Sequence, residues 1–269
     1  MLREASRRAA ILATMPAEIT SSANPRIRRL IGLKDRKNRD SESVFILEGA
    51  DDIGRAIGAG LTPREIYYDP EGAGRVFRAD IEVTVDEAVL AHVSYRRRSQ
   101  GLIAVFEQFA TSLEALTFGR DPLVMVVEAI EKPGNLGAIL RTADAVGAAA
   151  VIAADTATDI FNPNVIRASV GAVFSVPVAV GEIEETVRFL ADRKLRLIAA
   201  DPAATATIWS VDLTGPCALL VGSEHNGLSE TARSAADAVV AIPMRGTVDS
   251  LNTSVSAALL AYEAMRQRA

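Results

Sequence analysis

The apolar run from Leu123 to Val127 constrains the fold of this chain most strongly. It is rich in β-branched side chains and shows no polar alternation, which is typical of a parallel strand buried on both faces. Further along, the pattern predicts strands at 149–153, 195–199, 218–221 and 239–242, and helices at 135–146, 183–193, 229–236 and 251–267. This alternation of strands and helices predicts an α/β domain with a mostly parallel sheet.

The residues before this domain predict a second, smaller α/β unit. Short apolar runs favour strands at 44–47, 65–68, 81–85 and 101–106, with helices at 51–59 and 86–92. A polar, mixed stretch separates this unit from the larger one. We therefore expect a flexible basic arm at 1–18, a small domain at 19–106, a linker at 107–121 and a larger domain at 122–269.

Residue counts exclude several classes of protein. Cys217 is the one cysteine, so a disulfide within the chain is impossible and a reducing, cytoplasmic location is expected. The sequence has only two histidines, so we predict no metal site. No apolar run approaches the roughly 20 residues that span a bilayer, so no membrane segment is expected.

Charge is distributed unevenly along the chain. Taken whole, the net charge of −5 argues against nucleic-acid binding. Residues 1–39, however, hold 10 Lys and Arg against 3 Asp and Glu, whereas the remaining residues hold 19 against 31. A basic segment joined to an acidic body indicates that nucleic acid could be bound through that segment alone.

Three motifs follow predicted strands, and the first is Glu131–Ala143. Gly134 and Gly137 permit a tight turn and a close approach of the backbone to a ligand. Asn135 stands where the N-cap of the following helix is expected, and Arg141 lies nearly two turns further along. An amide and an arginine near a helix N-terminus suit a phosphate or a ribose, although a capped helix with a surface arginine has the same pattern.

The second motif is Leu220–Leu228, directly after a predicted strand. Gly222 lets a flat ligand lie against the main chain, and Glu224 supplies the carboxylate of this motif. His225 resembles a general base, but a single histidine in a loop is more often incidental.

The third motif is Ile242–Ser256, in which a strand ends, a polar loop follows, and Ser250 and Asn252 start the last helix. Such residues hold a polar ligand or simply cap the helix. All three motifs follow strands of one sheet, and ligands of open α/β sheets bind beyond the carboxyl ends of the strands. A shared ligand site is therefore favoured over three separate caps.

Nucleotide cofactors fit these motifs less well. A dinucleotide fingerprint needs G-x-G-x-x-G after a strand, and only G-x-x-G is present, so an oxidoreductase is disfavoured. The phosphate-binding pattern G-x-x-x-x-G-K-[ST] does not occur.

In order and spacing, the three motifs resemble the signatures of the SpoU (TrmH-type) RNA 2′-O-ribose methyltransferases of the SPOUT superfamily. The resemblance covers about residues 121–268, and Thr253 stands where the family more often has valine. Residues 19–110 resemble, more loosely, the L30e-like substrate-binding domain found ahead of it. The resemblance implies a deep C-terminal trefoil knot, S-adenosylmethionine as cofactor, and a homodimer in which Arg141 of one subunit approaches the cofactor of the other.

The resemblance also implies site residues. The catalytic set is Asn135, Arg141, Glu224, Ser250 and Asn252. The cofactor-binding set is Gly222, Ile242, Leu251, Met244 and Ala200. Basic side chains expected to bind RNA are Arg26, Arg28, Arg29, Lys34, Arg36, Lys37, Arg39, Arg96, Arg97 and Arg98.

The implied reaction is methyl transfer to a ribose 2′-hydroxyl, most readily of ribosomal (23S) RNA. A tRNA methyltransferase, an enzyme of antibiotic resistance and a non-catalytic RNA-binding protein remain alternatives. Arginine keeps its proton to about pH 12, so we expect Arg141 to stabilise the developing alkoxide rather than to act as a base. Glu224 would then accept a hydrogen bond from Arg141 or Asn252. The apolar stripe along 251–267 predicts either a dimer surface or a core face.

Overall fold

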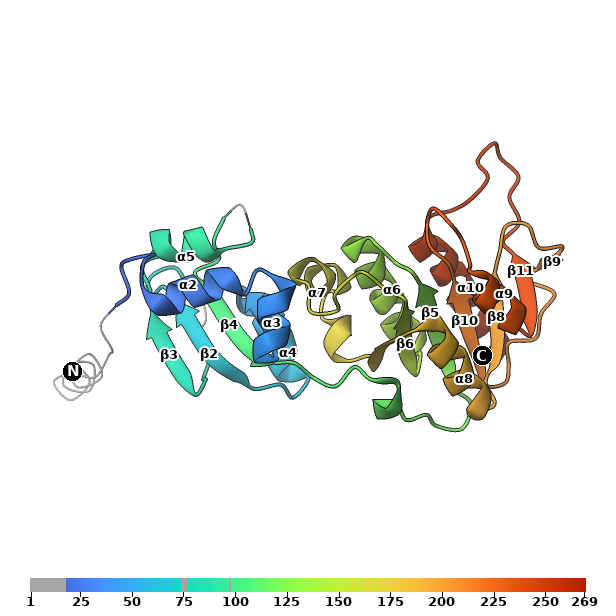
Figure 1. The fold of residues 1–269 in the computed structure, drawn as a ribbon, viewed down its shortest axis with the longest axis horizontal. Helices are drawn as coiled ribbons and strands as arrows, with labels where there is room; N and C mark the ends of the chain where they lie inside the picture. The colour runs from blue at the N-terminus through green and yellow to red at the C-terminus, as the bar shows by residue number, and fades with distance from the viewer. Residues whose placement is uncertain (1–17, 74–76, 97) are drawn as a thin grey trace. The chain divides into compact units, whose positions relative to one another are not determined.

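The computed structural model describes residues 18–73, 77–96 and 98–269 (Figure 1). The basic arm predicted at 1–18 thus lies, except for its last residue, outside the described residues, as does Arg97. The chain divides between Gln108 and Phe109 into two compact units. We call them unit 1 and unit 2 and describe each by itself.

Unit 1 holds a four-stranded sheet in the order β1-β4-β2-β3, with β2 and β3 parallel and the other pairs antiparallel. The four predicted strands are present with boundaries within two residues of those expected. The elements are α2 (Pro25–Gly32), α3 (Arg36–Glu42), β1 (Val44–Glu48), α4 (Ala50–Gly58), β2 (Pro63–Tyr68), β3 (Ile81–Thr84), α5 (Glu87–Val93) and β4 (Leu102–Glu107).

The basic stretch before β1, for which no element was predicted, forms two helices. Asn24 caps α2 by accepting from the Arg26 backbone N–H, and Pro25 supplies the first helical residue. Ile27, Leu30 and Leu33 are fully buried against the sheet, so α2 belongs to the core of unit 1. The described part of the expected basic segment therefore belongs to two helices, of which α2 packs on the sheet.

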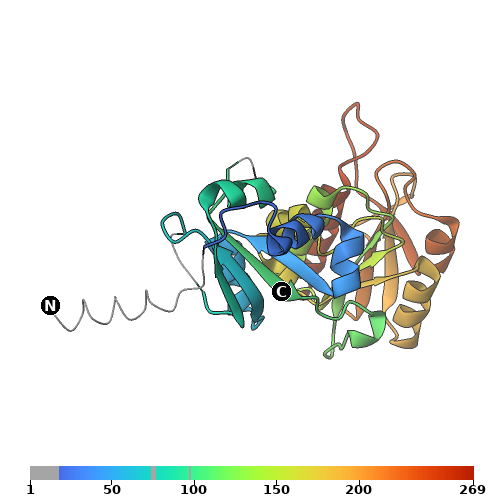
Figure 2. The ribbon, with the colours of Figure 1, turned by 60° about the vertical axis from the view of Figure 1, so that its left-hand side comes forward.

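Unit 2 holds a seven-stranded sheet in the order β7-β6-β5-β10-β8-β11-β9, and all its paired strands are parallel (Figures 1 and 2). This confirms the predicted α/β class. The strands are β5 (Leu123–Glu128), β6 (Ala150–Ala154), β7 (Val178–Gly181), β8 (Arg196–Ala200), β9 (Ala206–Thr207), β10 (Cys217–Val221) and β11 (Ala238–Ala241). The trefoil knot stays a prediction.

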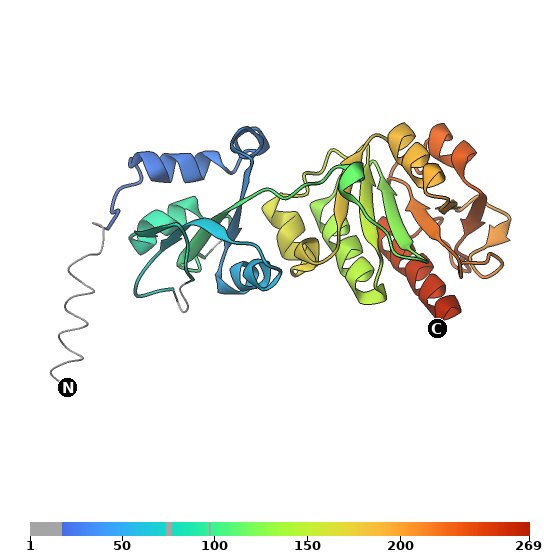
Figure 3. The ribbon, with the colours of Figure 1, turned by 90° about the horizontal axis from the view of Figure 1, so that it is seen from below.

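Helices cover both faces of this sheet. Figure 3 shows α8 and α9 on one face and α6 and α10 on the other. The helical segments are η1 (Leu113–Ala115), α6 (Pro133–Val146), α7 (Pro163–Ser169), η2 (Ala172–Phe174), α8 (Ile183–Asp192), α9 (Glu230–Ala235) and α10 (Thr253–Arg268). In the described part of the chain, no helix is long and apolar enough to cross a membrane.

The stretch expected as a linker, 107–121, is folded onto unit 2. Leu113 and Leu116 are buried in the core beside β7, and Val180 N–H donates to the Thr111 carbonyl at 2.7 Å. Apolar residues at these two positions explain the packing. The boundary between the units therefore lies at the start of the predicted linker.

Candidate functional site

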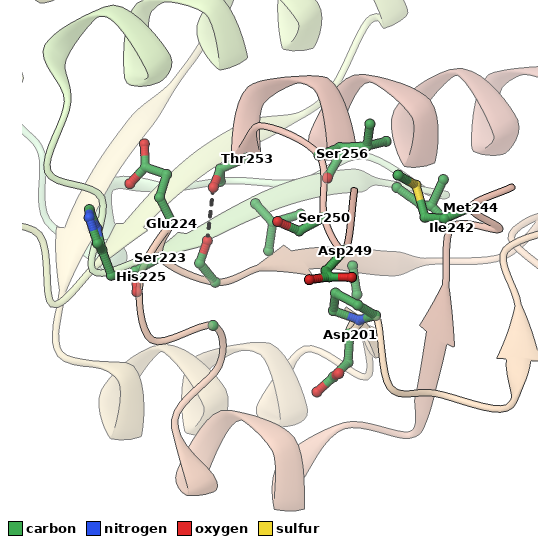
Figure 4. Close-up of a pocket in the computed structure, with 16 residues that line it drawn as sticks. Asp201, Ser223, Glu224, His225, Ile242, Met244, Asp249, Ser250, Thr253 and Ser256 are labelled. Carbon is green, nitrogen blue, oxygen red and sulfur yellow. Dashed lines mark hydrogen bonds between the residues drawn. The ribbon is translucent and has the colours of Figure 1, made fainter. Parts of the chain in front are cut away.

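A cavity of about 370 Å³ opens at the carboxyl ends of β8, β10 and β11 (Figure 4). The loops that follow these strands and the first turn of α10 line it. All five residues expected to bind the cofactor lie around this one cavity: Ala200, Gly222, Ile242, Met244 and Leu251. Two of the expected catalytic residues, Glu224 and Ser250, line it as well.

Gly222 lies in the cavity wall, directly after β10. A paired turn closes beyond it, in which Ser223 N–H donates to the Gly227 carbonyl at 3.0 Å. A Cβ atom at Gly222 would collide with the carbonyl group of Gly227 and lie 2.6 Å from the Leu228 nitrogen. Only glycine therefore fits here, because backbone atoms occupy the place of a side chain.

Thr253, the residue that departs from the family pattern, ties the first turn of α10 to this loop. It is buried, and its hydroxyl donates to the Gly222 carbonyl at 3.3 Å (Figure 4). A valine would fill the same volume without this hydrogen bond. Asn252, the residue before it, caps α10 by accepting from the Ser254 N–H at 2.9 Å.

A chain of polar side chains connects the three motifs. Asn252 Nδ2 donates to Asn135 Oδ1 at 3.2 Å, and Asn135 Nδ2 donates to Glu224 Oε1. Lys132 Nζ lies 4.0 Å from the same carboxylate oxygen. The adjacent parallel strands β5 and β10 bring the first two motifs together at one edge of the sheet.

The structure corrects two expectations about this chain of contacts. Glu224 accepts from Asn135 rather than from Arg141 or Asn252. Asn135 is not the N-cap of α6, because the helix starts two residues earlier at Pro133, with Lys132 as the N-cap. Proline needs no hydrogen bond at the first helical position and has a helical φ already, so it sets the start. The amide of Asn135 is thereby left to bind Glu224.

Glu224 keeps one unsatisfied atom. Its side chain is mostly buried, and Oε2 has no hydrogen-bond partner among the described residues. A buried carboxylate oxygen is costly without a donor. The site therefore offers an acceptor to a hydroxyl or cation that enters it.

Arg141 lies apart from the cavity. It is exposed on α6 and makes no hydrogen bond or ion pair with any described residue. Gly137, one turn before it, does not approach a ligand as expected: a Cβ there would collide with Ala168 and lie 2.8 Å from the Ser169 nitrogen. Gly137 serves close packing of α6 on α7, and Arg141 is free to reach another molecule.

The basic residues of unit 1 that were expected to bind RNA fall into two groups. Arg29 pairs with Glu42 and Glu65, Lys34 donates to two backbone carbonyl groups, and Arg96 pairs with Asp52. Arg39 is 2% exposed and donates to the carbonyl groups of Leu33 and Lys34 just after α2, which removes it from the set that can touch RNA. Of the residues expected to bind RNA, the exposed ones are Arg26, Arg28, Arg36, Lys37 and Arg98, of which Arg36 has an i,i+4 partner.

Two acidic residues of the cavity were not predicted as site residues. Asp201 follows β8 directly, and Asp249 precedes Ser250 in the last loop. The position of Asp201 after a strand was a usable signal. Nothing in the pattern distinguished Asp249 from the neighbouring loop residues.

Comparison with known proteins gives a consistent result. Residues 122–262 match the SpoU rRNA Methylase family, and residues 24–104 match an MRM3-like substrate binding domain. A 23S rRNA (uridine(2479)-2′-O)-methyltransferase from Streptomyces viridochromogenes is 31% identical over 95% of this chain and 94% of its own length. The 23S rRNA (guanosine-2′-O-)-methyltransferase RlmB of Ralstonia nicotianae is 36% identical over 69% of this chain and 77% of its own.

Solved structures agree over both units. The crystal structure of an RNA 2′-O ribose methyltransferase has 42% sequence identity and a TM-score of 0.81, covering 94% of this chain and 99% of its own. The SpoU methyltransferase AviRb from Streptomyces viridochromogenes, solved with AdoMet, has 29% identity and a TM-score of 0.85, covering 91% of this chain and 98% of its own.

Proposed function

The chain belongs to the SpoU rRNA methylase family, and from this membership we propose that it methylates a ribose 2′-hydroxyl of 23S ribosomal RNA. S-adenosylmethionine is the methyl donor. The observation that carries the proposal is the convergence of three motif loops on one cavity at the carboxyl edge of the sheet. Ribosomal RNA is favoured over tRNA because the Streptomyces relative, which matches along both units, is named a 23S rRNA enzyme, whereas a structure described for methylation of tRNA covers 55% of this chain.

The residues around the cavity fit S-adenosylmethionine. The turn that packs on Gly222 shapes one wall, although the place of its missing side chain is taken by the backbone of Gly227 rather than by ligand space, and Ile242, Met244 and Leu251 supply apolar surface. When bound, the cofactor supplies a methyl group on a sulfonium, which leaves as a neutral thioether. The chain itself must then place the ribose oxygen and manage its proton.

Holding the reacting groups in the right geometry can lower the activation barrier by roughly 7–11 kcal/mol. We propose that the hydrogen-bonded side chains of Asn252, Asn135 and Glu224 hold the ribose in this way. We propose that the free Oε2 of Glu224 accepts a hydrogen bond from the ribose or from the arginine that binds it. Ser250 lies between Glu224 and the far side of the cavity and completes the ribose pocket (Figure 4). In this scheme Arg141 holds the adjacent phosphate and stabilises the alkoxide as it forms.

We propose that the enzyme works as a homodimer through α10. Val255, Leu259, Tyr262 and Met265 are each more than 40% exposed, so the stripe is not a core face. The opposite face of the same helix packs inward with Ala257, Leu260, Ala261 and Ala264. Because α10 packs beside α6, a second copy seated on this stripe would bring its own Arg141 near the site.

Methyl incorporation tests the catalytic assignment. Arg141→Ala should lower transfer to ribosomal RNA about 10²–10³-fold, as the loss of a transition-state donor does. S-adenosylmethionine affinity, measured by calorimetry, should stay within about twofold because Arg141 does not line the cavity. Near-normal turnover in Arg141→Lys would rule out a role for the forked guanidinium. Mapping ribose methylation in cells with and without the gene then identifies the nucleotide, and an unchanged map would favour a non-catalytic RNA-binding protein.

A further inference from the structure

The described side chains that line the cavity carry charge of one sign. They include three carboxylates, Asp201, Glu224 and Asp249, together with His225, and neither a lysine nor an arginine. A cavity lined in this way attracts a cation and does not favour a neutral ligand of the same shape. The three carboxylates differ, however, in how far their charge is already compensated.

Asp201 and Glu224 both have partners. Asp201 is buried, forms an ion pair with Arg233 of α9 and accepts from the Ala203 N–H at 2.8 Å. Glu224 accepts from Asn135 and has Lys132 at 4.0 Å. The charge of Asp201 is thus paired, and that of Glu224 is partly compensated at Oε1, while its Oε2 stays without a donor.

Asp249 is the uncompensated carboxylate. It makes no hydrogen bond or ion pair with the described residues, and it lies in the loop before Ser250. Figure 4 shows its side chain beside Ser250 and above Asp201, on the opposite side of Ser250 from Glu224. Asp249 is exposed, so its charge is open both to solvent and to a molecule that fills this end of the cavity.

The methyl donor and its product differ in charge at one atom. S-adenosylmethionine carries a positive sulfonium, whereas S-adenosylhomocysteine carries a neutral thioether, and apart from the transferred methyl group the two molecules are the same. A carboxylate a few ångströms from the sulfur near a protein surface can change their relative affinity about tenfold. This difference in charge separates substrate from product in addition to the loss of one methyl group.

We propose that Asp249 is a specificity-determining residue that makes the cavity bind S-adenosylmethionine more tightly than S-adenosylhomocysteine. The proposal rests on the proposed methyltransferase function and adds product release to it. After transfer the attraction to Asp249 disappears, so the product leaves a site that has not changed shape.

Calorimetry on the full chain with three probes tests the proposal. The probes are S-adenosylmethionine, S-adenosylhomocysteine and sinefungin, whose protonated amine restores the positive charge. We expect the wild type to bind the two cations about 3–10-fold more tightly than S-adenosylhomocysteine, with a preference that shrinks as salt rises. Asp249→Asn should lose this preference because it weakens the binding of the two cationic probes only. Asp249→Glu should keep the preference.

Asp192→Asn is the matched control, because it removes one exposed carboxylate at the end of α8, outside the cavity lining. It should keep the wild-type ratio of affinities. Equal wild-type affinity for all three probes overturns the inference while leaving the proposed function intact. An Asp249→Asn variant that weakens all three probes equally, or none of them, overturns it as well. Failure of the wild type to bind any of the three would instead reject the proposed function itself.

Discussion

At the scale of single residues, Gly222 gives the sharpest prediction. In Gly222→Ala the new methyl group meets the backbone of Gly227 and Leu228, which no rotamer change can relieve. We expect the turn to shift, S-adenosylmethionine affinity to fall at least about tenfold, and stability to drop by roughly 1–3 kcal/mol. Calorimetry and thermal unfolding measure both effects. Gly119→Ala is the control, since a Cβ there meets no atom within 4 Å, and an equal loss in that variant would contradict the steric argument.

Site residues were predictable from sequence where a motif fixes the local backbone. Gly222 and Ile242 follow the ends of strands, so strand prediction placed them at the same edge. The hydrogen-bond partners of Asn135 and Glu224 were not predictable, because they depend on the residue at which α6 starts. Because α6 starts at Pro133, two residues before the predicted start, Asn135 lies inside the helix. Its side chain then donates to Glu224 instead of capping the helix.

The contacts of charged residues could not be predicted from the sequence either. Arg39 and Lys37 are equivalent in the sequence, two positions apart in a basic run. The structure buries Arg39 against the residues that follow α2 and leaves Lys37 exposed. Composition therefore located the basic region, but packing decides which of its cations can meet a phosphate.

At the scale of elements, the exposed stripe of α10 predicts the oligomeric state. Leu259→Glu should dissociate the proposed dimer, because it would place a charge at the centre of the proposed apolar contact. Light scattering after size-exclusion chromatography would show the monomer, and methyl transfer should fall with it. Arg188→Glu on the exposed side of α8 is the control and should stay dimeric. A wild type that is monomeric at micromolar concentration would contradict the proposed assembly.

The last turn of α10 predicts a pH dependence. Hydrogen bonds from Arg266 and then Gln267 lower the pKa of Glu263 from 4.5 to about 2. Because the folded state favours the charged form, this stabilisation is complete above about pH 4.5 and is lost as the pH falls toward 2. The melting temperature of Glu263→Gln should thus lie below that of the wild type at neutral pH and converge with it in acid. A gap that stays constant down to pH 2 would contradict this account.

Periodicity predicted most elements of unit 2 but missed the region between β6 and α8. The helix in that region, α7, has only seven residues and starts at Pro163, with Asn162 as its N-cap. The strand β7 has four residues, too few to show a hydrophobic periodicity. In unit 1, α2 and α3 were missed because their exposed faces are mainly charged. Ile27, Leu30 and Leu33, spaced by three, carried the helical signal.

At the scale of the whole molecule, the uneven charge calls for a test that keeps unit 1 folded. Deleting residues 1–39 would not do so, because Ile27, Leu30 and Leu33 belong to its core. The loss of three fully buried aliphatic side chains would cost several kcal/mol, a large share of the stability of a small domain. Reduced RNA binding by such a truncation would reflect unfolding as much as lost charge.

Neutralising exposed cations on the intact chain avoids this confusion. In the double variant Arg26→Gln/Arg28→Gln, α2 keeps its buried face and loses two positive charges from its exposed one. If both touch phosphates, RNA affinity falls, and the slope of log affinity against log salt becomes shallower by about 0.7–0.9 for each lost contact. Filter binding across a salt series measures the slope, and calorimetry should show unchanged S-adenosylmethionine affinity.

The matched control removes two cations from unit 2, in Arg120→Gln/Arg188→Gln, which changes the net charge equally. A general electrostatic attraction between the protein and RNA would make both variants lose affinity alike. Local contacts on α2 would change the salt slope in the first variant only. Equal slopes in the two variants and the wild type would show that the basic region of unit 1 is a solvated helix face, and RNA capture would then have to depend on the remaining exposed cations of the chain.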